Sequence, residues 1–301
     1  MRVLDLPRVV QRRLGHALRS RVAGDDAAIR AERIWRATGE RWFTPDDPIW
    51  RVHADASMFA GGIASLLLQS LHPLAMAGVA GHSGYKSDPW GRLQRTSHYL
   101  AATTYGTTKD AEEAIARVRS IHDRVRGRDH LGRPYWAGDP DLLLWVHAAE
   151  IDSFLRAHQV FGQRPLSPVE ADRYVEQAAV AARLLGVIDP PTTVGGLAQV
   201  LDAFRPALES TAAARDAARF LLLEPPLPLV ARPGYGTLAS GGVSLLPPWA
   251  RSMLGIPLPA PVSRCVAQPL GLAGTAAVRW ALAGLGERRP SDQPEREIAQ
   301  S

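Results

Sequence analysis

The sequence predicts an all-α protein built as a single helical domain, and three observations support this. Apolar residues recur at helical spacing, most clearly between Asp88 and Gly186. No stretch of more than a few residues alternates between apolar and polar side chains, as a half-buried strand would. The sequence contains neither a glycine-rich phosphate loop nor a strand-helix alternation, which excludes a dinucleotide-binding fold.

The composition of the 301-residue chain narrows its class further. Because 46% of the residues are apolar, the chain can bury a core that offsets the entropy of folding, and global disorder is excluded. Cys265 is the only cysteine, which excludes an intrachain disulfide framework and cysteine-rich metal sites. The net charge of +5 does not indicate a nucleic-acid partner, because all but two of the 35 basic residues are arginine, which is more typical of a coding bias.

Three segments differ in composition and divide the chain. Residues 1–28 form a basic N-terminal arm, residues 29–286 form the helical domain, and residues 287–301 form a polar tail that we expect to be frayed. The arm is either a helix packed on the domain or a peripheral contact with an anionic membrane surface. No apolar secretory segment follows it, so we expect a cytoplasmic protein, with membrane association through the arm as the alternative.

Residues 58–80 are the one segment with the length and apolarity of a membrane span. Gln69, His72 and Pro73 lie near its middle, where polar groups would be costly in lipid and proline breaks a helix. The segment therefore predicts a buried helix, broken or kinked at Pro73, around which the other helices pack.

Start and stop signals define the next two helices. Asp88-Pro89 supplies an N-cap and a proline at the first helical position, and that helix should end near Gly106. From residue 109 to residue 125 the apolar positions follow one helical face, and Gly127 stops the pattern.

The same signals predict the remaining helices. Asp139-Pro140 opens a helix that ends at Gly162, and Ser167-Pro168 opens one that ends at Gly186. Residues 192–204 and 208–222 are expected as further helices, residues 224–261 as proline- and glycine-rich loops joining short helices, and residues 271–285 as the last helix.

Nine histidines in a helical chain with one cysteine are the natural candidates for ligands. His122 lies on the apolar stripe of its helix, so a neutral imidazole there needs a hydrogen-bond partner or a metal. His147 lies in an apolar run, and His72 lies just before the proline break. Ordinary hydrogen bonds are expected for the other six: His16, His53, His82, His98, His130 and His158.

A haem suits these histidines better than other cofactors do. Haem iron needs only one axial histidine and an apolar helical cavity. A di-iron bundle would need two Glu-x-x-His pairs, a zincin would need His-Glu-x-x-His, and a common serine hydrolase would need Gly-x-Ser-x-Gly after a strand. None of these motifs is present in the sequence.

Arg92 and Thr96 form a second constellation, because their i, i+4 spacing puts both on one helix face, which Tyr99 and Thr103 continue. An arginine with a hydroxyl one turn on is suited to hold an anionic group such as a haem propionate, or to hydrogen-bond a polar axial ligand. The alternative is structural: Arg92 pairs with a carboxylate such as Asp88, and Thr96 bonds back to the helix backbone.

Several motifs occur in a specific order. The chain contains SLHPLAMAGVAGHSGYKSDPWGRLQRTSHYLAATTYGT, then IHDRVRG, then WAGDPDLLLWVHAAEIDSF, then LSPVEADRYVEQAAVAARLLGV. In this order the motifs resemble the domain shared by latex clearing protein, a rubber oxygenase, and the mycophenolate-pathway oxygenase. The resemblance is closest over residues 49–187.

The resemblance implies a helical fold loosely related to globins that holds a b-type haem non-covalently. In the studied members it also implies cleavage of an isoprenoid carbon–carbon double bond with O2. The family's proximal iron ligand carries over to His122, and its Arg-x-x-x-Thr motif near the haem carries over to Arg92 and Thr96. His147 matches a recurrent family histidine with a structural or supporting role and is the second candidate ligand.

Two positions depart from the rubber enzyme. Where that enzyme has a distal lysine directly before the motif's threonine, this chain has Arg95, and where it has a glutamate proposed as a base, this chain has apolar residues around Met76. Arginine is effectively always protonated and does not replace a neutral lysine on iron. The resemblance thus implies catalytic positions at Arg92, Arg95 and Thr96, but not cleavage of rubber itself.

Together these observations predict a haem b-dependent, oxygenase-like protein that acts on a small apolar molecule, isoprenoid or lipid-like, with O2 or peroxide. Two alternatives stay open. The first is a non-catalytic haem-binding or lipid-binding helical protein. The second is a membrane-peripheral interaction protein that uses its basic arm.

Overall fold

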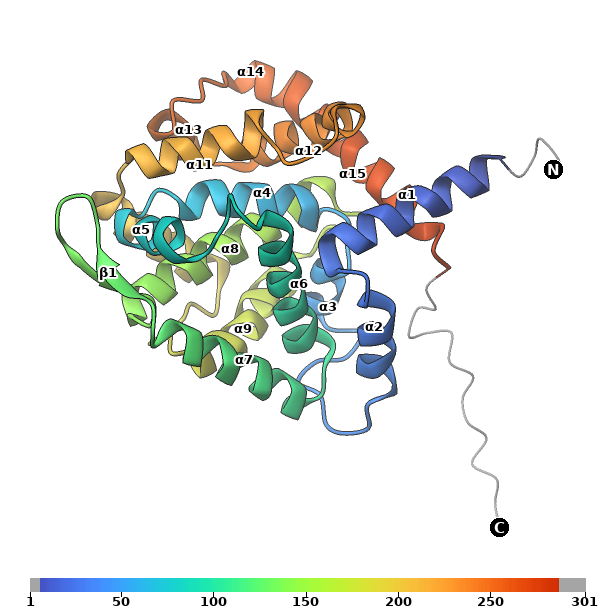
Figure 1. Cartoon of the computed structure of the whole chain (residues 1–301), viewed down its shortest axis with the longest axis horizontal. Coiled ribbons are helices and arrows are strands. Elements are labelled where there is room, and N and C mark those ends of the chain that lie inside the picture. Colours follow the sequence, from blue (N-terminus) through green and yellow to red (C-terminus); the bar gives the residue numbers. More distant parts are fainter. Residues whose placement is uncertain (1–5, 287–301) are drawn as a thin grey trace, which may run out of the picture.

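A computed structural model describes residues 6–286, in which helices dominate (Figure 1). The longer helices are α1 (Leu6–Ala23), α2 (Ala27–Arg36), α4 (Met58–Gln69), α5 (Pro73–His82), α6 (Pro89–Tyr105), α7 (Thr108–His122), α8 (Pro140–Phe161), α9 (Pro168–Leu185), α10 (Val194–Phe204), α11 (Ala212–Leu223), α12 (Arg232–Leu245) and α15 (Gln268–Ala283). The shorter ones are α3 (Pro48–His53), η2 (Arg205–Ala207), η3 (Leu229–Ala231), α13 (Pro248–Met253), α14 (Ala260–Val262) and η4 (Ser263–Ala267). The all-α prediction is confirmed, while the polar tail at 287–301 lies outside the described residues.

A short antiparallel hairpin is the one exception to the helical pattern within residues 6–286. Strand β1 (Arg126–Arg128) pairs with β2 (Pro134–Trp136), with Gly127 opposite Tyr135. The prediction of a helix as far as residue 125 is wrong, because α7 ends at His122. Gly127 is needed here because a Cβ atom on it would come within 2.5 Å of the Tyr135 hydroxyl oxygen. Strands of three residues are too short to show a period of two.

Helix α4 lies at the centre of the fold, between α8 and α12. Its Leu67 and Leu68 side chains have no exposed surface, which confirms the prediction of a buried helix. The predicted break is also confirmed, because α4 and α5 meet at an angle of 109° just before Pro73. No single helix among the described residues has the length and apolarity to cross a membrane, and α4 with α5 passes that test only as a bent pair.

Helix α12 is longer than its prolines and glycines predict. The sequence predicts loops and short helices over 224–261, which is wrong for the 14 residues of α12. Its glycines allow close packing: a Cβ atom on Gly241 would come within 2.7 Å of the Gly271 Cα atom. A Cβ atom on Gly242 would come within 3.0 Å of the Ala60 carbonyl oxygen. These glycines therefore serve helix contacts with α15 and α4, and do not end the helix.

The two ends of the described chain lie side by side (Figure 1). Helix α1 packs along both α15 and α6. Gly15 approaches α15 so closely that a Cβ atom on it would come within 2.5 Å of the Ala281 carbonyl oxygen. The Gln11 side chain donates to the Trp280 carbonyl oxygen at 2.7 Å. The described part of the basic arm is therefore a helix packed on the domain.

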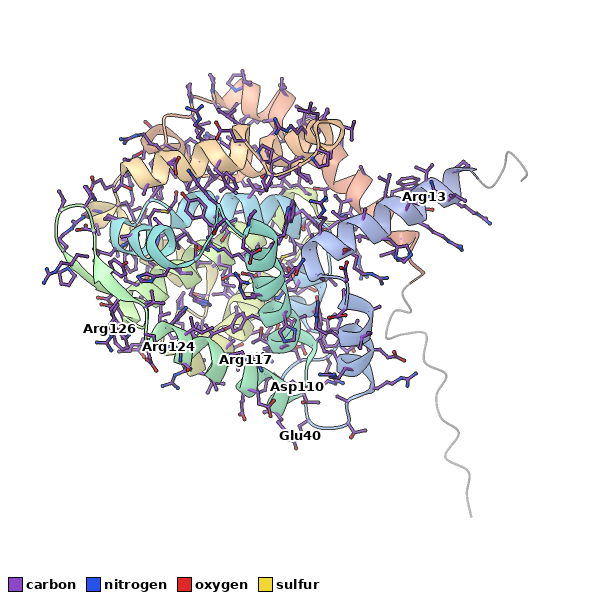
Figure 2. All side chains as sticks on the ribbon, viewed as in Figure 1. Arg13, Glu40, Asp110, Arg117, Arg124 and Arg126 are labelled. Atoms are coloured by element: carbon purple, nitrogen blue, oxygen red, sulfur yellow. The ribbon has the colours of Figure 1, made fainter. Side chains whose placement is uncertain are left out.

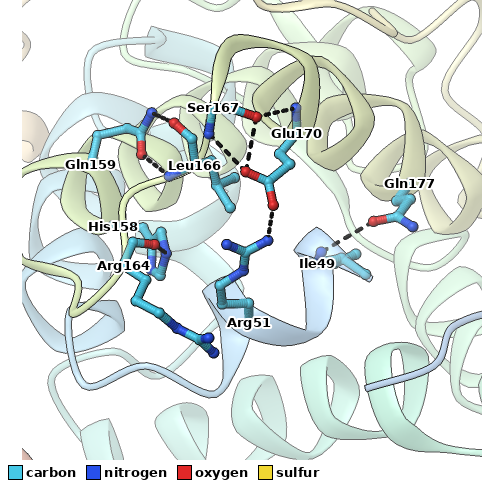
Figure 3. A network of polar contacts seen from close by, with 9 residues as sticks. All are labelled: Ile49, Arg51, His158, Gln159, Arg164, Leu166, Ser167, Glu170 and Gln177. Atoms are coloured by element: carbon cyan, nitrogen blue, oxygen red, sulfur yellow. Dashed lines mark hydrogen bonds and ion pairs between the residues drawn. The ribbon is translucent and has the colours of Figure 1, made fainter. Parts of the chain in front are cut away.

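A network of polar contacts joins α3, α8 and α9 (Figure 3). Ser167 and Glu170 form a capping box at the start of α9, and Glu170 also pairs with Arg51 of α3. On α8, the His158 Nε2 atom lies 3.0 Å from the Arg164 carbonyl oxygen. This network fixes the angle between three helices through groups that satisfy one another.

Candidate functional site

Arg92 and His122 lie at the same end of a helical hairpin formed by α6 and α7. Arg92 is near the start of α6, and His122 is the last residue of α7. The two helices pack on each other, and their connection is held by a capping box between Thr107 and Asp110. Both residues therefore lie away from the α6–α7 connection, toward the free ends of the two helices.

Helix α7 turns an apolar face inward and a charged face outward. Ala111 and Ile115 are buried on the inner face, and His122 continues that face, half-buried, at the end of the helix. Arg117 of α7 and Arg124, two residues after its end, are exposed, and Arg124 lies at the edge of the molecule in Figure 2. The amphipathic pattern thus directs the His122 imidazole inward.

The His122 imidazole has no hydrogen-bond partner in residues 6–286. Its Nδ1 atom is buried without a partner. Burial lowers its pKa, opposed in part by the nearby Asp123 carboxylate, so the neutral ring is favoured. A neutral imidazole with free nitrogens is the form that binds a metal.

Arg92 is a partly buried guanidinium that has no carboxylate partner in the described part of the chain. Its Nη1 atom donates to the Ser83 hydroxyl oxygen at 3.2 Å. Burial and the neighbouring charge of Arg95 lower the pKa of Arg92. The alternative in which Asp88 pairs with Arg92 is not observed, because Asp88 pairs with Arg95 at 3.2 Å on the exposed surface. Arg92 is therefore suited to receive an anionic group.

The α6 stripe that begins at Arg92 becomes more deeply buried toward the end of the helix. Along it, Thr96 is exposed, Tyr99 is half-buried and Thr103 is buried. Burial raises the pKa of Tyr99, and the nearby Glu150 carboxylate of α8 raises it further. Thr96 donates its hydroxyl to the Arg92 carbonyl oxygen at 3.1 Å, the backbone bond that the structural alternative anticipates.

Helix α8 presents His147 and Glu150 one turn apart on one face. Burial lowers the pKa of His147 to about 4, with a smaller contribution from the Arg183 charge, and raises the pKa of Glu150 to about 7. The His147 Nε2 atom is buried without a partner. Both side chains nevertheless keep partial accessibility, so they touch space that the chain does not fill.

The packing of the helices agrees with this accessibility. Helix α8 packs on α4, α9 and α10, but neither α6 nor α7 is a close neighbour of α8 in the described structure. Helix α7 packs on α9, and α6 packs on α3 (Figure 1). Half-accessible side chains lie on all three helices: Tyr99, Val118, His122, His147 and Glu150. Of these, Tyr99 of α6 lies near Glu150 of α8.

The other buried histidines of the core have defined partners. The His53 Nδ1 atom lies 2.8 Å from the Thr104 hydroxyl oxygen, and its Nε2 atom lies 3.4 Å from the Tyr174 hydroxyl oxygen. His72 caps α5 by accepting from the Ala75 backbone N–H. These contacts explain His53 and His72 without a ligand.

Glu150 is the candidate that the motif search does not identify. The sequence signal for it is a carboxylate three residues after His147 in the apolar run LLLWVHAAEID, which also contains Asp152. No group of three or more His, Cys, Asp or Glu side chains within residues 6–286 is arranged to hold a metal ion. Ligation of haem iron requires only one or two such side chains.

The family of the chain follows from a comparison with family models. The model described as the catalytic domain of the ER-bound oxygenase mpaB/B'/rubber oxygenase matches residues 50–281. The chain therefore belongs to this family of oxygenase catalytic domains, and the family suggested by its motifs is confirmed. Searches of curated proteins and of solved structures found no match.

Proposed function

We propose that this protein is a haem b-dependent oxygenase that acts on a small apolar substrate with O2 or peroxide. Membership of an oxygenase family supports the reaction class. The observation that carries the haem proposal is the His122 imidazole, which is directed inward and has a buried Nδ1 atom without a partner. In this proposal His122 holds the iron, and the bound haem supplies the activation of the oxidant.

Arg92 supports the same placement of the cofactor. Haem propionates are anionic, and a partly buried guanidinium bonded only to a hydroxyl offers them charge-assisted hydrogen bonds. Arg95 adds positive charge beside Arg92 while its own ion pair with Asp88 keeps it at the surface. Thr96, exposed on the same stripe, would contact the haem edge or its distal side.

The proposal places the cofactor and the substrate between α6, α7 and α8, where half-buried side chains such as Val118 of α7 would help to exclude water. His147 lies across this region from α6 and is the second candidate for the iron ligand, or a group that supports the first.

An absorption spectrum of the protein expressed with adequate iron tests the haem proposal, and we expect a Soret band. His122→Ala should abolish the band or greatly reduce it, whereas His98→Ala, an exposed histidine of α6, should leave it unchanged. An unchanged spectrum of the His122 variant would move the ligand to His147. The absence of a Soret band in the unmodified protein would contradict the proposal.

A non-catalytic haem-binding or lipid-binding protein is the second candidate function. It is favoured by Arg95, which occupies the position of the distal lysine, and by the apolar residues around Met76, where the rubber enzyme has a glutamate. Oxygen consumption with isoprenoid substrates separates the two candidates, because only an oxygenase consumes O2 in proportion to the substrate.

A peripheral membrane contact through α1 is a third proposal, compatible with a cytoplasmic protein. Val10 and Leu14 of α1 are 45% and 49% exposed among arginines, as in a helix that lies on an anionic surface. Flotation with phosphatidylserine liposomes should therefore weaken in a Val10→Ser, Leu14→Ser variant. Equal flotation of both proteins, or none, would contradict it.

A further inference from the structure

Tyr99, His147 and Glu150 form a polar cluster between α6 and α8. His147 and Glu150 lie one turn apart on the same face of α8. Glu150 also lies close enough to Tyr99 of α6 for its carboxylate to disfavour ionisation of the phenol. The cluster thus bridges two helices that are not close neighbours in the described fold.

None of these three side chains has a partner within residues 6–286. The His147 Nε2 atom is buried without a hydrogen bond. The Tyr99 hydroxyl and the Glu150 carboxyl form neither a hydrogen bond nor an ion pair with the described chain, although neighbouring His53 and Tyr174 contact each other. An unpaired buried polar atom costs free energy, so the His147 Nε2 atom, beside two accessible polar groups that no part of the described chain pairs, indicates that a group from outside the chain binds here.

The cluster offers hydrogen bonds with little formal charge near neutral pH. The His147 Nε2 atom is a buried hydrogen-bonding group without a partner, and Tyr99 stays a phenol because burial raises its pKa. Glu150, with a pKa of about 7, is protonated in about half of the molecules at that pH. This composition suits a neutral polar group, unlike the cationic end of the α6 stripe at Arg92.

We propose that Tyr99, His147 and Glu150 form a subsite that binds the hydroxyl or carbonyl group of an otherwise apolar substrate. The inference rests on the proposed function, because it assumes that the substrate enters the region beside the haem. It narrows the substrate class to isoprenoid alcohols or carbonyl compounds, because a pure hydrocarbon would leave all three groups unpaired.

Binding of farnesol and of the hydrocarbon farnesene to the full-length protein tests the subsite. Tryptophan fluorescence serves as the readout, since Trp145 belongs to α8, the helix that carries His147 and Glu150. Farnesol should bind roughly tenfold more tightly than farnesene, as expected when one or two hydrogen bonds are satisfied. Equal affinities, or no binding of either probe, would overturn the proposal.

Variants assign the preference to the cluster. Glu150→Leu should remove the preference for farnesol without weakening farnesene, while Glu150→Gln, which keeps the hydrogen-bonding groups, should retain most of it. Tyr99→Phe should reduce it partially. Glu176→Leu, at an exposed carboxylate of α9, is the matched control and should behave as the unmodified protein. A Glu150→Leu protein that keeps the preference would overturn the assignment.

Two further measurements separate this inference from the haem proposal. Infrared spectroscopy should show the band of a protonated carboxyl that is absent from Glu150→Gln and shifts when farnesol is added, and the lack of such a shift would overturn the subsite. The haem content of each variant is measured in parallel. A preference for farnesol in a protein without haem would contradict only the haem proposal, whereas full haem occupancy without the preference would contradict only the subsite.

Discussion

Glu150 and Glu170 have opposite pKa shifts because they lie in two different environments of the same molecule. Glu170, at the start of α9, accepts hydrogen bonds from Arg51 and Ser167, which lower its pKa to about 2. Glu150, in the middle of α8, has no partner among the described residues, and burial raises its pKa to about 7. The two carboxyls have opposite preferences for the proton because one is satisfied by the fold and the other is not.

The histidines of α8 repeat the contrast. The His158 Nε2 atom lies 3.0 Å from a backbone carbonyl oxygen in the network of Figure 3, although its Nδ1 atom is buried without a partner, while neither ring nitrogen of His147 has a hydrogen bond within residues 6–286. The groups in the network hold α3, α8 and α9 together, and Glu150 lies on the part of α8 that is near Tyr99 of α6. Polar groups without hydrogen-bond partners are typical of functional sites. We therefore assign a structural role to the face of α8 that carries His158 and a functional role to the face that carries His147 and Glu150.

The largest predicted effect comes from removing the charge of Glu150. Its pKa in the folded protein, about 7, lies above the ordinary value of 4.5, so the folded state holds a proton that the unfolded state has lost between these pH values. Stability therefore falls as the pH rises from 4.5 to 7 and stays low above. At roughly 1.4 kcal/mol per pKa unit, Glu150→Gln should stabilise the protein by about 3 kcal/mol at pH 8.

Urea unfolding of the unmodified protein and of Glu150→Gln at pH 5 and pH 8 measures this effect. The difference between the two proteins should be large at pH 8 and shrink toward zero at pH 5, because the carboxyl is then protonated in the folded state. A difference that is independent of pH would show that Glu150 is not held as a raised-pKa carboxyl.

Glu170→Gln should have a smaller effect of opposite sign. Its pKa of about 2 in the folded protein lies below the ordinary 4.5, so its contribution is present above pH 4.5 and is lost as the pH falls toward 2. At pH 7 the variant should melt about 2–4 °C below the unmodified protein. The gap should narrow in thermal melts between pH 4.5 and pH 3, and a gap that widens on acidification would contradict the assignment.

The smallest effect is expected for Arg95→Ala. Arg95 and Asp88 are 63% and 58% exposed, so their ion pair is screened by water. The free energy of unfolding should change by less than about 0.5 kcal/mol, and the Soret band should persist. Arg92→Ala is the matched comparison and should lower haem retention. A loss of haem in the Arg95 variant would give that side chain a direct role that its surface position does not suggest.

Much of the fold can be predicted because its signals are local. Asp88-Pro89, Asp139-Pro140 and Ser167-Pro168 each start a helix in the structure, at the positions that their capping chemistry indicates. The hairpin around Gly127 and the helix around Gly241 are not predicted, since the role of each glycine depends on a distant contact with an aromatic ring or another helix.

The residues of the candidate site also divide into those that local sequence signals predict and those that only the assembled fold identifies. Motif and periodicity single out His122 and Arg92, and the capped connection between α6 and α7 explains why they lie at the same end. Glu150 is not identified because its importance lies in the lack of a partner, which is a property of the assembled helices. A sequence records which groups are present but not which remain unpaired after packing.

The contact of α1 with α15 sets an order of events during synthesis. Helix α6 carries Arg92 and Tyr99, and α1 covers its outer side, but α1 itself is held by α15 through the approach of Gly15 to Ala281. A ribosome releases α15 more than 200 residues after α1, so the outer support of α6 is completed only once α15 has emerged. Loading of a cofactor against α6 would thus follow the synthesis of α15.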